Sequence, residues 1–199
     1  MKKVMITALV LLLAAASASA QKMAIGNNVA DDLFLGTLNL QAQYAVGQHW
    51  SLTADVKYNP WTFHKGEAGN EDSMSSQLQA RQRSAALGAR WWPWHIYSGW
   101  WVAGKAKWQE YNSNFWCVND QIVYHGLQTE EGTRAGLSLG FGYSFMLTSW
   151  FDLDVGVSGW GGGQWYSRYA CPTCGRLVES GVKGFLLPDE LTLALIFIF

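Results

Sequence analysis

The residues best suited to acid–base or nucleophilic chemistry are two histidines, His64 and His125, in polar segments that also carry carboxylates. A histidine oriented by a carboxylate can activate a hydroxyl nucleophile, such as a serine between residues 73 and 76. None of these residues stands in a recognisable catalytic motif. We therefore predict no catalytic residue, no enzymatic activity and no bound cofactor, with an envelope lipid-modifying enzyme as the alternative.

The cysteines offer a second kind of chemistry. Cys171 and Cys174 form a Cys-Pro-Thr-Cys sequence, whereas Cys117 stands apart. In an exported chain this spacing favours a local disulfide between Cys171 and Cys174. A zinc site needs about four ligands and a thioredoxin-like site expects a βαβ context, so both are weaker alternatives. We predict no metal site, and the sequence assigns no role to Cys117.

A third set of polar residues lies on segments with a two-residue alternation of polar and apolar side chains. We expect these side chains to face the inside of a closed sheet and to pair there, because buried charges are tolerated only when they are paired. The predicted interior network consists of Asp55, Lys57, Arg90, Lys105, Lys107, Gln109, Asp152 and Asp154.

The elements that must position these residues are strands, because successive side chains of a strand point to opposite faces. Alternation predicts strands over residues 38–46, 51–58, 84–91, 100–109, 136–145, 151–158 and 191–199, with a weaker one over 23–29. Short turns alternate with long polar connections at residues 59–76, 113–132 and 165–189. This layout is typical of an outer-membrane barrel. We predict an all-β fold, an eight-stranded antiparallel up-and-down transmembrane β-barrel.

The two ends of the chain agree with export to an outer membrane. Residues 1–20 contain a basic start, an apolar run and a small-residue cleavage site, which predict a signal peptide before a barrel domain at 21–199. The last strand places Phe197 and Phe199 on its apolar face, and such a terminal aromatic strand resembles the signal read by the barrel-insertion machinery. We expect the Gram-negative outer membrane as the location and its lipid as a partner.

Aromatic residues cluster toward the predicted strand ends, as in the aromatic girdles of membrane barrels. The predicted membrane-interface aromatics are Tyr58, Trp61, Trp91, Trp92, Trp94, Trp108, Trp150 and Trp160.

Two soluble folds with the same alternation remain open. In a soluble periplasmic barrel the apolar faces would surround a ligand, and in a sandwich they would pack sheet on sheet. Nucleic acid is not an expected partner: without Lys2 and Lys3, 12 of the 14 basic residues remain against 15 acidic ones.

Several segments together resemble domain-of-unknown-function family 3575, small outer-membrane β-barrels of Bacteroidetes. The segments are Trp50-Ser-Leu-Thr-Ala-Asp55, Tyr58-Asn-Pro-Trp-Thr-Phe63, Ala89-Arg-Trp-Trp92, the strand from Gly99 to Tyr111, and Cys171-Pro-Thr-Cys-Gly175. The resemblance implies an eight-stranded barrel. It also implies a structural or interaction role, because family members often lie in gene clusters for fimbriae or other surface structures. We expect anchoring, adhesion or service to a surface-fibre or cell-envelope partner.

Overall fold

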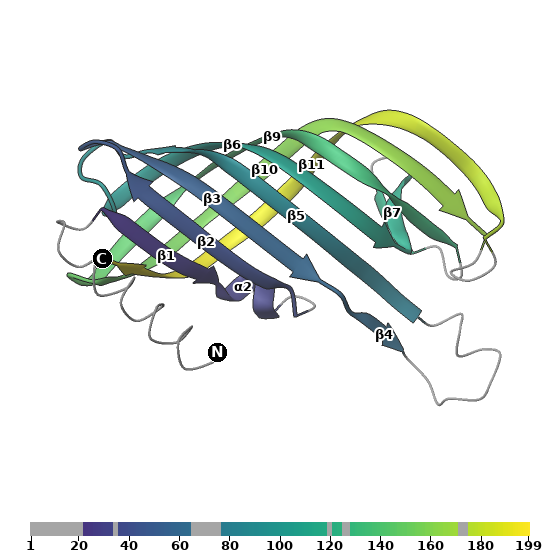
Figure 1. Ribbon diagram of the computed structural model, residues 1–199, viewed down its shortest axis with the longest axis horizontal. Helices are drawn as coiled ribbons and strands as arrows, with labels where there is room; N and C mark the ends of the chain where they lie inside the picture. Colours follow the sequence, from purple (N-terminus) through teal and green to yellow (C-terminus); the bar gives the residue numbers. More distant parts are fainter. Residues whose placement is uncertain (1–21, 34–35, 65–76, 119–120, 125–127, 171–174) are drawn as a thin grey trace, which may run out of the picture.

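The computed structural model describes residues 22–33, 36–64, 77–118, 121–124, 128–170 and 175–199. Eight antiparallel strands form one sheet that closes in a ring (Figure 1). They are β1 (Met23–Asn28), β2 (Leu38–Ala45), β3 (Trp50–Asn59), β5 (Gln77–Trp91), β6 (Gly99–Ser113), β9 (Thr129–Thr148), β10 (Phe151–Tyr169) and β11 (Leu177–Ile198). The predicted all-β antiparallel fold and its eight strands are confirmed.

Smaller elements join the ring strands. The short helix α2 (Val29–Leu33) links β1 to β2, β4 (Thr62–His64) pairs with the start of β5, and β7 (Phe115–Val118) pairs with β8 (Gln121–Tyr124). No helix in the described part of the chain is long and apolar enough to cross a membrane. The predicted signal peptide lies outside the described residues.

Each ring strand pairs with its neighbours in the chain, and β1 pairs with β11 to close the ring. From Ala24 the register passes through the other six strands to Leu187 of β11, whereas Ala24 pairs directly with Ile198. The register therefore advances by eleven residues in one circuit, one of them contributed by a bulge opposite Ser158 and Gly159. Such a stagger requires strands that are tilted to the ring axis by about 35–45°.

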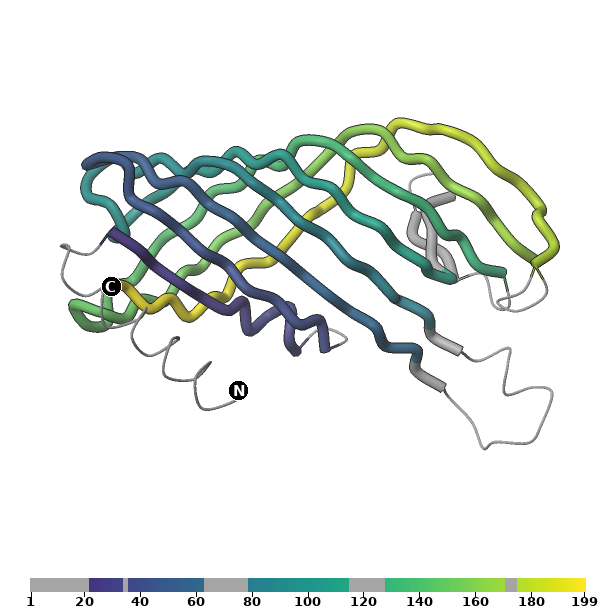
Figure 2. Tube along the Cα trace, in the orientation of Figure 1, coloured from purple at the N-terminus to yellow at the C-terminus, as the bar shows by residue number. Residues whose placement is uncertain are grey.

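Three strands are much longer than the sequence predicted. The segments 113–132 and 165–189, which we expected to be loops, contain the outer parts of β9, β10 and β11. Figure 2 shows these three strands continuing well past the ends of β1 and β2. Their outward side chains are no longer regularly apolar there, so the backbone pairing continues where the hydrophobic alternation stops.

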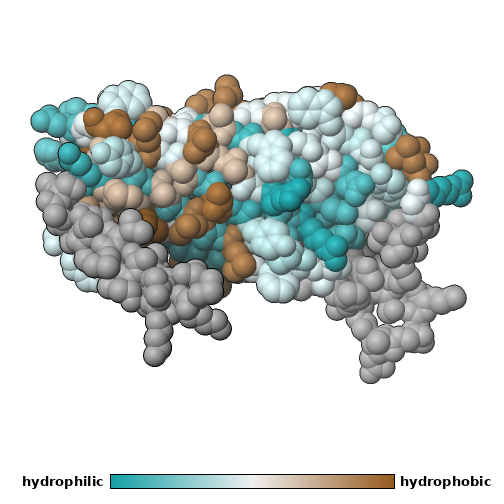
Figure 3. Space-filling model, in the orientation of Figure 1, coloured by the Kyte–Doolittle hydropathy of each residue, from teal (hydrophilic) through white to brown (hydrophobic). Residues whose placement is uncertain are grey.

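The ring is apolar outside and polar inside over most of its height. The outward positions of β9, for example, include Leu137, Leu139 and Phe141, all largely exposed, while Ser138 and Ser144 on the other face are buried. In Figure 3 the hydrophobic side chains gather mainly toward the end of the molecule that carries the C-terminus, and a hydrophilic region follows beyond them.

The hydrophobic core is small and lies inside the ring at the end with the short turns. It comprises Ala24, Trp92, Tyr97, Trp101, Ala103, Ala194, Ile196 and Ile198. Two glycines make room for it, because a Cβ atom on Gly142 or Gly156 would stand 2.4 or 2.7 Å from the Trp101 ring. The core therefore closes this end of the ring interior.

Candidate functional site

The most deeply buried ion pair lies next to the hydrophobic core. A guanidinium nitrogen of Arg90 on β5 stands 2.5 Å from the Asp154 carboxylate on β10, and the two side chains are only 1% and 2% exposed. The guanidinium lies 4.0 Å from the centre of the Trp101 ring, and Ser144 donates a hydrogen bond to Asp154. Asp152 is buried on the same face of β10, and the described residues provide it with no ion pair.

Two further pairs occupy the middle of the interior. Lys105 on β6 stands 2.8 Å from Asp55 on β3. Lys107 pairs with Asp189 on β11, which also accepts a 2.6 Å hydrogen bond from Ser138. These contacts join strands that are not neighbours in the sheet, so the charges link separate parts of the ring across its interior.

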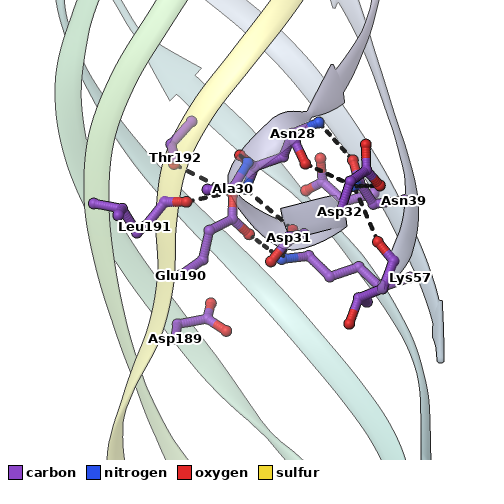
Figure 4. Close-up of polar contacts among 12 residues, drawn as sticks. Asn28, Ala30, Asp31, Asp32, Asn39, Lys57, Asp189, Glu190, Leu191 and Thr192 are labelled. Atoms are coloured by element: carbon purple, nitrogen blue, oxygen red, sulfur yellow. Dashed lines mark hydrogen bonds and ion pairs between the residues drawn. The ribbon is translucent and has the colours of Figure 1, made fainter. Parts of the chain in front are cut away.

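A third group lies where β1 ends and β2 begins. The Lys57 ammonium stands 2.6 Å from Asp31 of α2 and 2.7 Å from Glu190 of β11 (Figure 4). A single cation therefore ties the short helix to two strands of the wall. Gln109, the remaining predicted interior residue, donates a 2.5 Å hydrogen bond to Gln82.

Two asparagine side chains take the place of backbone groups at the same seam. The Asn28 amide donates to the Leu191 carbonyl at 3.1 Å and accepts from the Leu193 N–H at 2.9 Å. The Asn39 amide in turn bonds both backbone groups of Asn28, at 2.6 and 2.9 Å. The side-chain amides thus extend the ladder by one step beyond the last residue of β1.

A separate cluster surrounds Glu130 in the outer part of β9. This fully buried carboxylate accepts hydrogen bonds from Tyr111 at 2.8 Å, Gln164 at 2.7 Å and Arg168 at 2.9 Å. Burial raises the pKa of Tyr111, so its hydroxyl stays protonated and remains a donor. The cluster fixes β6, β9 and β10 to one another beyond the closed ring.

The predicted interior residues include both partners of the pairs Arg90–Asp154 and Lys105–Asp55, but only the lysines of the contacts made by Lys57 and Lys107. Asp31, Glu130, Asp189 and Glu190 were not predicted as interior residues. Glu190 had a usable signal, because it shares the inward face of the last strand with Thr192 and Ala194. Asp189 had none, because it occupies the bulge of β11.

Six of the eight predicted interface aromatics are exposed: Tyr58, Trp61, Trp91, Trp94, Trp108 and Trp150. The prediction is wrong for Trp92 and Trp160, which are 1% and 4% exposed. Trp92 belongs to the internal core, and Trp160 lies inside the ring with its indole 4.7 Å from the Lys107 ammonium. Both follow the alternation of their own strands, in which the even-numbered residues face inward.

The terminal aromatic residues lie beside the last short turn. Phe197 is exposed on the outer wall, with its ring 4.9 Å from that of Phe151 and 6.0 Å from that of Trp150. The Phe199 N–H donates to the Met23 carbonyl at 2.7 Å, so the last residue closes the ring against β1.

The predicted disulfide of Cys171 and Cys174 lies outside the described residues, as does His125. The side chains of His64 and Cys117 are not described either. The structure therefore leaves the disulfide and the enzymatic alternative as predictions. The apolar faces point outward and charged residues occupy much of the interior, which is the reverse of the polarity expected of a soluble barrel with apolar faces around a ligand.

A family model described as "Protein of unknown function (DUF3575)" matches residues 5–199. No curated protein and no solved structure matches the chain.

Proposed function

The chain belongs to the family of proteins of unknown function DUF3575, and from that premise we propose that it is an outer-membrane β-barrel of structural or interaction type. Exported by a cleaved signal peptide, it stands in the outer membrane of a Gram-negative cell. The barrel anchors an outward platform that serves adhesion or the assembly of surface fibres.

The observation that carries the proposal is the inverted polarity of the ring. Large apolar side chains cover its outside, including Leu40, Val56, Leu87, Leu139 and Phe141, while charged residues fill its inside. Soluble monomers rarely expose apolar surface on this scale. Outward apolar and inward polar residues on alternating positions are the pattern of a barrel in lipid.

The height of the apolar wall fits a bilayer. On β3 the exposed aromatics Trp50 and Tyr58 bracket the outward apolar residues Leu52 and Val56. Eight residue steps of about 3.3 Å, tilted by about 40°, rise by roughly 20 Å along the ring axis. The apolar band of outer-membrane barrels is about 25 Å tall between its aromatic girdles. We assign Trp50 to the inner girdle and Tyr58 and Trp108 to the outer one.

The filled interior favours an anchor over a channel. The cavity among Asp55, Lys105, Lys107 and Glu190 has a volume of about 10 Å³. This volume is enough for about one water molecule. The hydrophobic core around Trp92 and Trp101 occupies the interior closer to the short turns.

The outer parts of β9, β10 and β11 supply the platform. They rise beyond the outer girdle and are held together by the buried Glu130 cluster. A rigid sheet that projects from a membrane anchor can present loops to a partner, because binding specificity usually resides on loops held by a rigid scaffold.

Three measurements test the proposal. The detergent-extracted chain should migrate differently on a gel before and after boiling, and an epitope placed after Gly175 should be detected on intact cells. A deletion strain should lose at least one surface-fibre or adhesion protein from its surface. The full chain should restore that protein, whereas a chain lacking the outer β10–β11 hairpin (residues 163–184) should not. Release of the protein without detergent, or an unchanged surface in the deletion strain, would contradict the anchoring role.

A further inference from the structure

The outer wall changes from apolar to polar at one row of side chains. Tyr58 of β3 pairs in register with Arg83 of β5, and the Arg83 guanidinium lies 6.0 Å from the centre of the Trp108 ring. On the side of this row that is nearer the C-terminus of the chain, outward residues such as Leu87 and Leu137 are apolar. On the other side, the outward residues of β5, β6 and β9 include Arg81, Asn112 and Glu131. In the proposed orientation this row marks the outer surface of the bilayer.

Two adjoining grooves lie directly beyond this row. The larger, of about 560 Å³, extends over β3, β5, β6 and β9 and is lined by Tyr58, Arg81, Arg83 and Glu110, among others. The smaller, of about 410 Å³, extends over β9, β10 and β11 and includes Trp165 and Ser180. They share Glu131, Gly132, Thr133 and Ser167, so the two grooves adjoin at these residues and are together called the outer groove.

The polar side chains of the outer groove are held in place by hydrogen bonds across the strands. Gln79 donates to Asn112 at 2.9 Å, and Asn112 donates to Glu131 at 3.3 Å. Arg81 is held at 2.9 Å by Thr62, and Arg83 pairs with Glu110. A carboxylate accepts about four hydrogen bonds and a guanidinium donates five, so these groups keep unused hydrogen-bonding capacity at the lining of the groove.

The mixture of groups indicates what the outer groove can bind. Two arginines stand against two glutamates, so the groove has no net charge that would select an anion or a cation. It offers fixed donors and acceptors in alternation, together with the aromatic faces of Tyr58 and Trp165. A sugar ring matches this combination, because its hydroxyl groups both donate and accept while its carbon–hydrogen faces pack on aromatic rings.

We propose that the outer groove is a saccharide-binding site, an inference that rests on the proposed membrane orientation. Its ligand is either the sugar portion of an outer-leaflet glycolipid, which would reach the groove from the membrane side, or a glycan in solution. Both present the same hydroxyl chemistry.

The test uses the full chain in detergent micelles and isothermal titration with two probes. One is the lipid-free core oligosaccharide released from rough lipopolysaccharide, and the other is the intact rough lipopolysaccharide. We expect saturable binding of at least one probe. Binding of the intact glycolipid that is at least tenfold tighter assigns the site to the glycolipid, and equal affinity assigns it to a soluble glycan. Absence of binding of both probes overturns the proposal.

Three variants locate the binding. Arg81→Gln should weaken it about tenfold, because it removes a charged donor from the outer groove. Arg176→Gln is the matched control and should bind normally, since Arg176 is exposed immediately before β11 and outside the groove residues. Thr133→Trp should abolish binding by filling the part that the two grooves share. An equal loss in Arg81→Gln and Arg176→Gln, or unchanged binding by Thr133→Trp, refutes the site.

The same samples separate this site from the membrane proposal. Each variant is run unboiled and boiled on a gel before titration. A heat-dependent shift without sugar binding overturns the saccharide site alone, whereas loss of the shift in the unaltered chain overturns the membrane barrel on which the site rests.

Discussion

The buried pair of Arg90 and Asp154 provides the sharpest test of the interior. In Asp154→Asn the carboxylate is replaced by a neutral amide of almost the same shape. Arg90 then stays in place, 1% exposed and without its counter-charge. An arginine cannot shed its proton in a protein, so the buried charge cannot be neutralised by titration.

The expected cost follows from this geometry. Breaking one partner of a buried ion pair costs about 3–5 kcal/mol of unfolding free energy. The indole rings of Trp101 and Trp92, 4.0 and 5.4 Å from the guanidinium, continue to stabilise the cation and place the expected value toward the lower end. The matched control is Glu110→Gln, which breaks the exposed pair with Arg83 and should cost at most about 1 kcal/mol.

The assay is urea unfolding of the purified chain in lipid bilayers, followed by tryptophan fluorescence. A second variant separates charge from shape: Arg90→Met combined with Asp154→Leu removes both charges and should regain most of the loss. If Asp154→Asn costs no more than Glu110→Gln, the interior is wet enough to solvate Arg90, and the picture of a dry, paired interior is wrong.

Three other predictions concern the wall and the chain ends. Leu139 is 71% exposed in the middle of the apolar wall, and Leu139→Arg should cost about 2–4 kcal/mol of unfolding free energy in the same urea assay. Leu186 is 85% exposed beyond the outer girdle, and Leu186→Arg should cost close to zero. Equal costs would place both residues in the same medium. Deletion of Phe199 should slow insertion into membranes, measured by the appearance of the heat-shifted band, and an unchanged rate would remove its role as a signal. Cys171 and Cys174 should react with a maleimide only after reduction, and immediate labelling would argue against their disulfide.

The fold could be predicted from the sequence because one physical signal repeats in every strand. The alternation along Leu137, Leu139 and Phe141 reports a wall with two different sides, and the closed register follows from pairing neighbouring strands. The outer halves of β10 and β11 could not be predicted in this way. Both faces are near water or polar groups there, so the hydrophobic period disappears although the backbone ladder continues through Trp165 and Val182.

Several interior contacts were predicted on one side only, for a related reason. The alternation of inward and outward positions along β6 (its parity) places Lys107 inside. Its partner Asp189 is 82 residues away in the sequence and becomes a neighbour only when the ring closes. Trp92 and Trp160 show the opposite failure. Their parity was readable, yet grouping aromatics near strand ends assigned them to the outside. Parity is the stronger signal, because a side chain on a paired strand cannot change faces without a bulge.

The seam where β1 and β2 meet β11 explains how a ring with two short strands remains closed over the height of the proposed bilayer. Within the described residues, the part of β11 that precedes Leu193 pairs with no strand on the β1 side. The ladder stops there at the amides of Asn28 and Asn39, and Lys57 joins α2 to Glu190 behind them. This level coincides with Tyr58, the outer-girdle residue that pairs with Leu38 at the start of β2. Unpaired backbone groups are not tolerated in contact with lipid, whereas water can satisfy their hydrogen bonds. The ring is therefore complete over the height of the proposed bilayer and opens only beyond it, where Lys183 and Pro188 on β11 are residue types that discourage strand addition at an exposed edge.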